Sequence, residues 1–199
     1  LNRPIEEIWN DISKKAKGDV TRAKRRNLRV KPLETYDELK DYLILNSQWA
    51  KSKGLVLTEP FKDIELLWKN NNSGIEKIFL AYENDELISG VRIGFFNGIG
   101  FTNFVINSYR NSTNLGGTYL TWYVLEWAKN VGIRLYDFSG GTALTKDTDI
   151  SKNKRFYLLY KSKWGGKETP YYNFIKPRKK FFYNLYLILF NTVRRYHAF

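Results

Sequence analysis

Two short segments in the second half of the chain contain residues whose types and spacing could support chemistry. LYDFSGG, residues 135–141, places Asp137 before a glycine pair, and YKSKWGG, residues 160–166, places Lys161 before a tryptophan and a second glycine pair. The 199-residue chain has no cysteine and one histidine, His197. This composition excludes thiol nucleophiles, Cys/His metal sites and a Ser/His/Asp triad with an internal histidine. Chemistry must therefore use Lys, Arg, Asp, Glu, Tyr, Ser or backbone groups, or an attacking group of the substrate.

The hydrophobic pattern predicts an α/β fold around these segments. Helical spacing predicts a first helix from Pro4 to about Ala16 and a second, capped by Asp19, to about Arg26. The remaining elements are expected in this order: a strand at 28–33 with Pro32 at a sheet edge, helices from Thr35 to about Gly54 and at about 60–70, three strands joined by turns at Asn84-Asp85 and Asn97-Gly98, a helix at 118–130 ended by Gly132, a strand at 133–138, a helix at 151–163, a strand at 169–175, and a helix from about Arg178. A mixed central sheet with helices on both faces accommodates this order.

This order of elements is similar to that of the GNAT acyltransferase fold, and the two segments resemble a paired signature of its Fem-type branch. In that branch a "YDFGG" strand end precedes an "FK, two residues, FGG" segment. Residues 136–141 match the first with Ser139 inserted, and residues 160–166 match the second with Tyr160 and Trp164 in place of phenylalanine. The basic segment 4–30 also resembles the family's helix and strand at this position.

The resemblance implies transfer of an aminoacyl group from aminoacyl-tRNA to an amine of a peptidoglycan precursor. Fem-type proteins consist of two GNAT-like domains, and this chain would correspond to the second. Because the chain begins at Leu1 and contains no methionine, we expect a missing upstream domain. Three parts are predicted: a basic helical linker at 1–27, a GNAT-like domain at 28–177, and a basic, apolar helix at 178–199.

An aminoacyl ester is already activated, so a neutral amine can attack it without a protein nucleophile. Lys161 is the candidate catalytic cation, either for the oxyanion or for a terminal phosphate. Asp137 is the second catalytic candidate, to orient the amine or accept its proton. The alternatives are a surface lysine and a turn in which Asp137 accepts backbone hydrogen bonds.

Neighbouring residues are candidates for substrate binding, with packing and turn geometry as the alternative reading. A stacked nucleobase is the specific alternative to core packing for Trp164. The candidate substrate-binding residues are Tyr136, Ser139, Gly140, Gly141, Tyr160, Trp164 and Gly165.

An acyl-CoA donor would require a cradle of backbone amides at the start of the helix after the fourth strand. RNSTNLGG, residues 110–117, is a degraded form of that motif, with Arg110 distant from the glycines. Gly116, Gly117 and Thr118 could still offer free amides to a phosphate. Acyl-CoA therefore remains the alternative co-substrate, and a GNAT-like module that binds without catalysis is a third reading.

The net charge of +13 is concentrated at the two ends of the chain. Residues 14–31 hold nine basic residues against one aspartate, and residues 151–199 hold twelve against one glutamate. An anionic partner is expected, with a solvated charged face as the alternative. The predicted phosphate-backbone contacts are Arg22, Arg25, Arg26 and Arg29.

We expect a cytoplasmic protein, because no signal peptide or long apolar run is evident in the sequence. Residues 178–199 could contact the inner membrane face beside a lipid-linked substrate.

Overall fold

The computed structural model describes residues 1–54, 61–108, 115–139, 160–167, 169, 176 and 178–186. The chain divides into two compact units, Leu1–Lys167 and Glu168–Phe199. Residues 151–159 of the predicted helix at 151–163, and the predicted strand at 169–175 apart from residue 169, lie outside the described residues.

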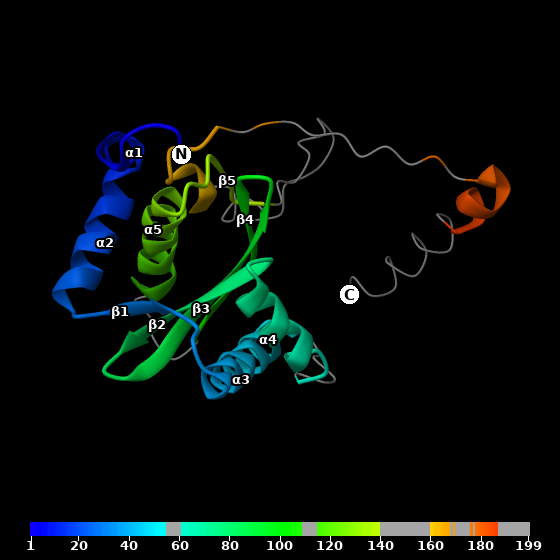
Figure 1. The fold of residues 1–199 in the computed structure, drawn as a ribbon, viewed down its shortest axis with the longest axis horizontal. Helices are drawn as coiled ribbons and strands as arrows, with labels where there is room; N and C mark the ends of the chain where they lie inside the picture. The colour runs from blue at the N-terminus through cyan, green and yellow to red at the C-terminus, as the bar shows by residue number, and fades with distance from the viewer. Residues whose placement is uncertain are drawn as a thin grey trace. The chain divides into compact units, whose positions relative to one another are not determined.

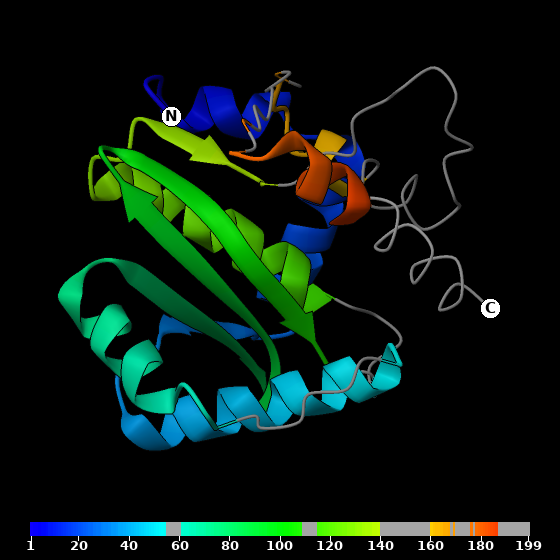
Figure 2. The same cartoon turned by 90° about the vertical axis from the view of Figure 1, so that its right-hand side faces the viewer.

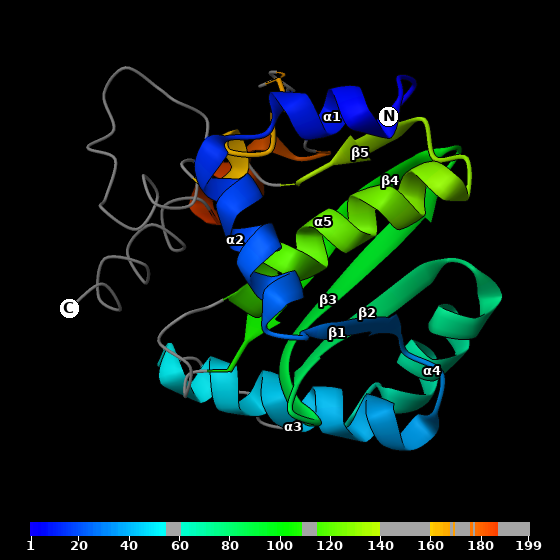
Figure 3. The same cartoon turned by 90° about the vertical axis from the view of Figure 1, so that its left-hand side faces the viewer.

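The first unit contains a five-stranded sheet with the order β1-β2-β3-β4-β5. Neighbouring strands are antiparallel except β4 and β5, which are parallel. Figure 1 shows the arrangement, and Figure 3 shows the sheet between α5 on one face and α3 and α4 on the other. The predicted mixed sheet with helices on both faces is confirmed. The bounds of the strands are β1 Arg29–Pro32, β2 Glu76–Glu83, β3 Glu86–Phe96, β4 Ile99–Asn107 and β5 Leu135–Asp137, and those of the helices are α1 Ile5–Asp11, α2 Lys14–Arg25, α3 Tyr36–Ser52, α4 Ile64–Ser73 and α5 Leu115–Asn130.

Both hairpin turns are as the sequence predicts. Asn84 and Asp85 have φ of 50° and 63°, and Asn97 and Gly98 have φ of 48° and 74°. Positive φ at both central residues is the conformation that matches the twist of two-residue hairpins, and asparagine, aspartate and glycine tolerate it best. These turns fix the order β2-β3-β4. The edge position of Pro32 on β1 is also confirmed.

The predicted boundary between the two N-terminal helices is wrong. The first helix, α1, ends at Asp11, and α2 begins at Lys14 instead of at Asp19. Ser13 caps α2, because its side chain accepts a hydrogen bond from the Ala16 backbone N–H at 3.2 Å. Asp19 instead lies buried within α2 and pairs with Arg22.

Helix α4 extends to Ser73, past the predicted end at about residue 70. Asn71 is buried, and its amide donates to the Leu33 carbonyl at 3.3 Å and accepts from the Ile78 N–H at 2.9 Å. The helix ends at Gly74, which has φ of 79°. Asn71 therefore joins α4 to the β1–β2 pair rather than acting as a helix stop.

The sheet has buried side chains on both faces. Alternate residues of β2 point to opposite sides, so that Phe79 and Ala81 pack toward α5, whereas Ile78 and Leu80 pack toward α3 and α4. Helix α5 begins at Leu115, three residues before the predicted start. Helix α5 is held close to the sheet by its apolar contact with the face that carries Phe79 and Ala81.

The N-terminal helices form a third apolar cluster with α5. Ile8, Ile12 and Val20 are buried against Trp122 and Trp164. This cluster connects the first helices to the turn that follows Tyr160, and both belong to the same compact unit.

In the second unit, residues 180–186 are helical, close to the predicted start at Arg178. Phe181, Phe182, Leu185 and Tyr186 are exposed on it. Among the described residues, no helix combines the length and hydrophobicity needed to cross a bilayer.

Candidate active site

The parallel strands β4 and β5 pair over three residues only. Ile99 to Phe101 lie opposite Leu135 to Asp137, and β4 then continues to Asn107. Figure 2 shows β4 and β5 diverging beyond this short contact. We call the region where they separate the β4–β5 split. Beyond Phe101, β4 pairs with β3 alone among the described residues.

The LYDFSGG segment forms one side of the split. The Tyr136 hydroxyl lies 2.9 Å from the Thr102 hydroxyl of β4, and burial raises the pKa of Tyr136, so this side chain stays neutral. The Asp137 carboxylate accepts a hydrogen bond from the Ser139 N–H at 2.7 Å, and Ser139 has φ of 53°. Asp137 therefore holds the turn after β5, as the alternative reading of this residue predicted. Gly140 and Gly141 lie outside the described residues.

The YKSKWGG segment is joined to α5 through Tyr160. Its hydroxyl lies 2.8 Å from the Thr121 hydroxyl and donates to the Gly117 carbonyl at 3.2 Å. Burial raises the pKa of Tyr160 to about 12. These bonds fix the end of the YKSKWGG helix, at 160–162, against the first turns of α5.

Trp164 lies in the core. Its side chain is 3% exposed, and its ring stacks on Phe138 with centroids 6.4 Å apart. Gly165 has φ of 71° and approaches the backbone of Asp11, so that an added Cβ would lie 3.0 Å from the Asp11 carbonyl oxygen. This geometry supports the packing reading of both residues, and it joins the segment to α1.

Lys163 was not selected from the sequence, yet its side chain contacts the start of α5. Its Nζ donates to the Thr118 hydroxyl at 3.2 Å and lies 4.3 Å from the centre of the Tyr160 ring. Burial lowers the pKa of Lys163, with a smaller opposing effect of Asp19. The sequence held one indication that Lys163 lies beside Tyr160, which is that the two residues are three positions apart and residues i and i+3 share a helix face.

Lys161, the predicted catalytic cation, is half-buried at the end of the same helical stretch. The structure brings the backbone of Lys161 and of Lys163 into one turn, because the Trp164 N–H donates to the Lys161 carbonyl at 3.1 Å. Of these two lysines, Lys163 is the one whose side chain contacts the first turn of α5. The free N–H groups of a helix start carry a partial positive charge, so an anion placed here would be stabilised by both sources of charge.

Gly116 and Gly117 serve close packing of α5 on the sheet. An added Cβ at Gly116 would lie 2.9 Å from Ile88, and one at Gly117 would lie 2.6 Å from the Asn107 oxygen. Both glycines and Thr118 are buried. The two glycines allow the start of α5 to lie directly against β3 and β4. Arg110 lies outside the described residues.

The predicted phosphate contacts on α2 and β1 are mostly paired within the chain. Arg22 pairs with Asp19, Arg26 with Glu83 and Arg29 with Asp85. Among the described residues Arg25 has no such partner and is exposed. The four arginines lie on α2 and at the α2–β1 junction, whereas the split lies at β4 and β5.

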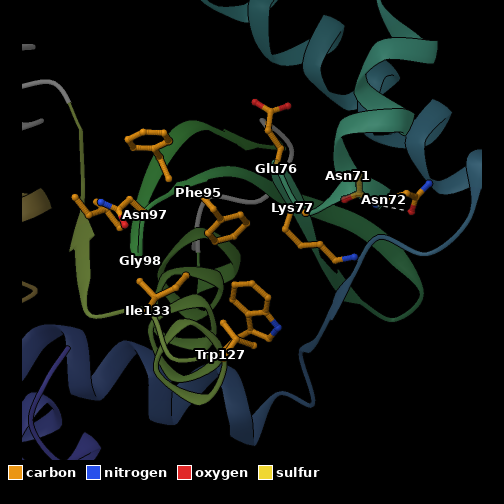
Figure 4. A pocket seen from close by; sticks show the side chains of 13 residues that line it. Asn71, Asn72, Glu76, Lys77, Phe95, Asn97, Gly98, Trp127 and Ile133 are labelled. Carbon is orange, nitrogen blue, oxygen red and sulfur yellow. Dashed lines mark hydrogen bonds between the residues drawn. The ribbon is translucent and has the colours of Figure 1, made fainter.

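A separate cavity lies away from the predicted site residues. It has a volume of about 550 Å³ and is lined by Phe95, Trp127, Lys77 and Ile133 among others, at the end of the sheet where β4 begins. Figure 4 shows Phe95 and Trp127 facing this cavity from β3 and α5. None of the predicted site residues lines it.

No protein-family model matches the chain, and no curated protein sequence matches it. Solved structures do match. The crystal structure of FemX superposes with a TM-score of 0.66 and 14% identity, over 82% of this chain and 56% of that chain. This chain has the GNAT acyltransferase fold. A probable acetyltransferase matches with a TM-score of 0.56 and 16% identity, over 76% of this chain and 98% of that chain.

An aminoglycoside N-acetyltransferase in complex with CoA also shares the GNAT fold, with a TM-score of 0.56 and 12% identity over 77% of this chain and 96% of that chain. The predicted GNAT fold with similarity to a Fem-type protein is therefore confirmed. The chain spans just over half of the length of FemX, whereas it spans nearly all of the two acetyltransferases.

Proposed function

We propose that this chain is an N-acyltransferase that transfers an aminoacyl group from aminoacyl-tRNA to an amine of a cell-wall precursor or a similar acceptor. One observation carries the proposal: the turn that contains Lys161 and Lys163 packs against the residue after β5, where Trp164 stacks on Phe138, and Lys163 contacts Thr118 at the start of α5. Similarity of fold to FemX supports the aminoacyl donor.

In the proposed reaction, the acceptor amine attacks the ester carbonyl carbon, the new C–N bond forms, and the carbonyl oxygen becomes an oxyanion. The C–O bond to the ribose then breaks, the ribose hydroxyl takes up a proton, and the amine loses one. Lys161 is proposed to stabilise the oxyanion through its positive charge. Lys163 and the helix start are proposed to bind a phosphate of the donor.

Tyr160 and Asp137 receive positioning roles in this scheme. Tyr160 fixes the lysine turn to α5 through Thr121 and Gly117, and Asp137 fixes the turn after β5. Holding the reacting groups in one geometry is itself a large part of catalysis when the ester is already activated.

Acyl-CoA is the second candidate donor, and a specific observation favours it. The acetyltransferases with the same fold match over nearly their whole length, and one of them was solved with CoA. A CoA thioester would undergo the same attack, with cleavage of the C–S bond and release of the thiol. The helix start with Lys163 suits the pyrophosphate of CoA as well as a tRNA phosphate.

A thermal-shift comparison separates the donors, because a ligand that binds the native state raises its melting temperature. The protein is heated alone and with acetyl-CoA, a longer acyl-CoA or aminoacyl-tRNA, each at matched concentration. Stabilisation by aminoacyl-tRNA alone supports the proposal, and stabilisation by a CoA ester supports the second candidate. Absence of any shift would reject both donors and favour a module without catalysis.

Further roles are proposed for the ends of the chain. Residues 178–199, whose described part carries four exposed apolar side chains and the basic residues 178–180, are proposed to contact an anionic membrane beside a lipid-linked acceptor at the cytoplasmic face. The division of the chain into a linker, a GNAT-like domain and a C-terminal helix, with an upstream GNAT-like domain, remains part of this proposal. Equal flotation with liposomes after removal of 178–199 would refute the membrane contact.

A further inference from the structure

The cavity beside the start of β4 has an aromatic wall that is held in place by the core. The Trp127 ring packs against Phe79 with ring centres 5.0 Å apart and against Phe95 with ring centres 5.4 Å apart. Phe79 is fully buried, whereas Trp127 and Phe95 are partly buried and line the cavity (Figure 4). Both rings therefore have one part fixed in the core and another part turned to the cavity. A wall that is ordered before binding reduces the entropy cost of holding a ligand.

The rim of the cavity carries large apolar side chains that stay in contact with water. Phe96 is 75% exposed and Val131 is 53% exposed, and both line the cavity. Ile99, at the start of β4, is a third exposed apolar residue of this lining. A bound apolar group would remove these side chains from water, which is favourable in proportion to the area covered. The cavity therefore suits a ligand with an apolar body.

Lys77 supplies a positive charge to this apolar cavity. It lies on β2 two residues before Phe79, so its side chain is on the face of the sheet that packs against α5. Lys77 is half-buried and lines the cavity. Among the residues that the structure describes, no hydrogen bond or ion pair joins its ammonium group to another side chain. The charge is therefore available to a ligand in the cavity.

The carboxylate next to Lys77 in the sequence is engaged on the opposite face of the sheet. Figure 4 shows Lys77 and Glu76 extending to opposite sides of β2. The Glu76 carboxylate accepts a hydrogen bond from the Asn103 amide at 2.7 Å and pairs with Arg92. Arg92 and Lys31 are also half-buried cations of this sheet, and each of them pairs with a glutamate. An anionic group in the cavity would give Lys77 the partner that these two residues have.

We propose that this cavity binds an apolar monocarboxylic acid, with its chain against Trp127 and Phe95 and its carboxylate on Nζ of Lys77. A single ammonium acts as a point charge, so it suits a head group with one negative charge. The volume of about 550 Å³ lies within the usual range of small-molecule sites, about 300–1,000 Å³. The lining contains none of the residues proposed for acyl transfer, so this site is independent of that function.

Three probes with one chain and different head groups test the site. Octanoate, octan-1-ol and octylammonium are titrated separately, and the indole N–H resonance of Trp127 is followed by NMR. This resonance is the one of six that Trp127→Phe removes. We expect octanoate to bind about two- to fivefold more tightly than octan-1-ol, as a half-exposed ion pair supports, and octylammonium to bind most weakly. The indole of Trp49, which packs on the other face of the sheet, should not shift.

Matched variants assign the head-group contact and the apolar contact. Lys77→Met leaves no partner unpaired, so the protein should stay folded and lose the preference for octanoate, whereas Lys77→Arg keeps the charge and should keep the preference. Lys51→Met, at an exposed position of α3, is the control and should change nothing. Phe96→Ser should weaken all three probes alike, whereas Phe61→Ser, at another exposed position, should not.

Several results would overturn the inference. Octan-1-ol that binds as tightly as octanoate, or a preference for octanoate that persists in Lys77→Met, would show that Lys77 does not bind the head group. Hydrogen phosphate that shifts the Trp127 resonance as strongly as octanoate would indicate a site for small anions instead. Absence of any shift at Trp127 with all three probes would show that the cavity does not take an apolar ligand.

Discussion

Substitution of Gly117 by alanine tests whether the first turn of α5 lies as close to the sheet as the structure indicates. An added methyl group at this position would lie 2.6 Å from the Asn107 oxygen, so Asn107 must move. That oxygen is held by the Ser89 hydroxyl at 2.7 Å, and Ser89 is fully buried. Movement therefore breaks a partly buried hydrogen bond and crowds a packed layer, which costs about 1–3 kcal/mol.

The alanine also gains about 0.5–1 kcal/mol as a better helix former. We expect a net loss of about 0–2.5 kcal/mol in the free energy of unfolding, measured by urea denaturation, and a melting temperature lower by up to about 10 °C. Gly18 in α2 is the matched control, because it is exposed and an added Cβ there meets no atom within 4 Å. Gly18→Ala should stabilise by about 0.5–1 kcal/mol. Equal stabilisation by both substitutions would refute the close approach of α5.

Three further substitutions probe charge and hydrogen bonding. Burial lowers the native pKa of Lys163, so between that pKa and the ordinary lysine pKa the unfolded chain binds more protons than the folded chain, and the stability of the fold rises with pH. Lys163→Met should abolish this rise. Urea midpoints that change in parallel for the two proteins from pH 7 to 10 would refute the prediction. Tyr160→Phe removes the hydroxyl bonded to Thr121 and should cost about 0.5–1.5 kcal/mol of unfolding free energy, with an unchanged midpoint speaking against that contact. Asn71→Leu leaves two backbone groups near β1 and β2 without their partner and should cost roughly 2–4 kcal/mol, so a loss below about 1 kcal/mol would contradict the bridging role.

The features that were predicted correctly depend on local sequence. The Asn97-Gly98 turn and the start of α3 after Thr35 are set by a few adjacent residues. Fold class followed from these local elements taken in order. Each of them would form the same way in many tertiary contexts.

The features that were missed depend on contacts between distant segments. Ser13 and Asp19 are both good capping residues, and packing of α2 against α5 decided between them by burying Asp19. Lys161 and Lys163 are likewise similar in sequence. Their difference arises because Tyr160 is fixed to α5, which directs Lys163 to Thr118.

The contact between the aromatic residues of the two segments, and hence their packing role, required the structure. Trp164 and Phe138 stack, which joins YKSKWGG to LYDFSGG. Burial of Trp164 at 3% exposure could not be inferred from composition, because an aromatic residue before two glycines suits either a core or a binding surface.

Single-turnover transfer measures the central claim most directly. Radiolabelled aminoacyl-tRNA is mixed with excess protein and 6-aminohexanoate, acetyl-CoA is tested in parallel, and amide formation is followed over time. We expect amide formation, with a rate that falls by about 10²–10³ in Lys161→Met, as loss of oxyanion stabilisation does in other acyl transfers. Lys167→Met, which changes an exposed lysine nearby, should keep the rate. No amide from either donor, or an unchanged rate in folded Lys161→Met, would contradict the account.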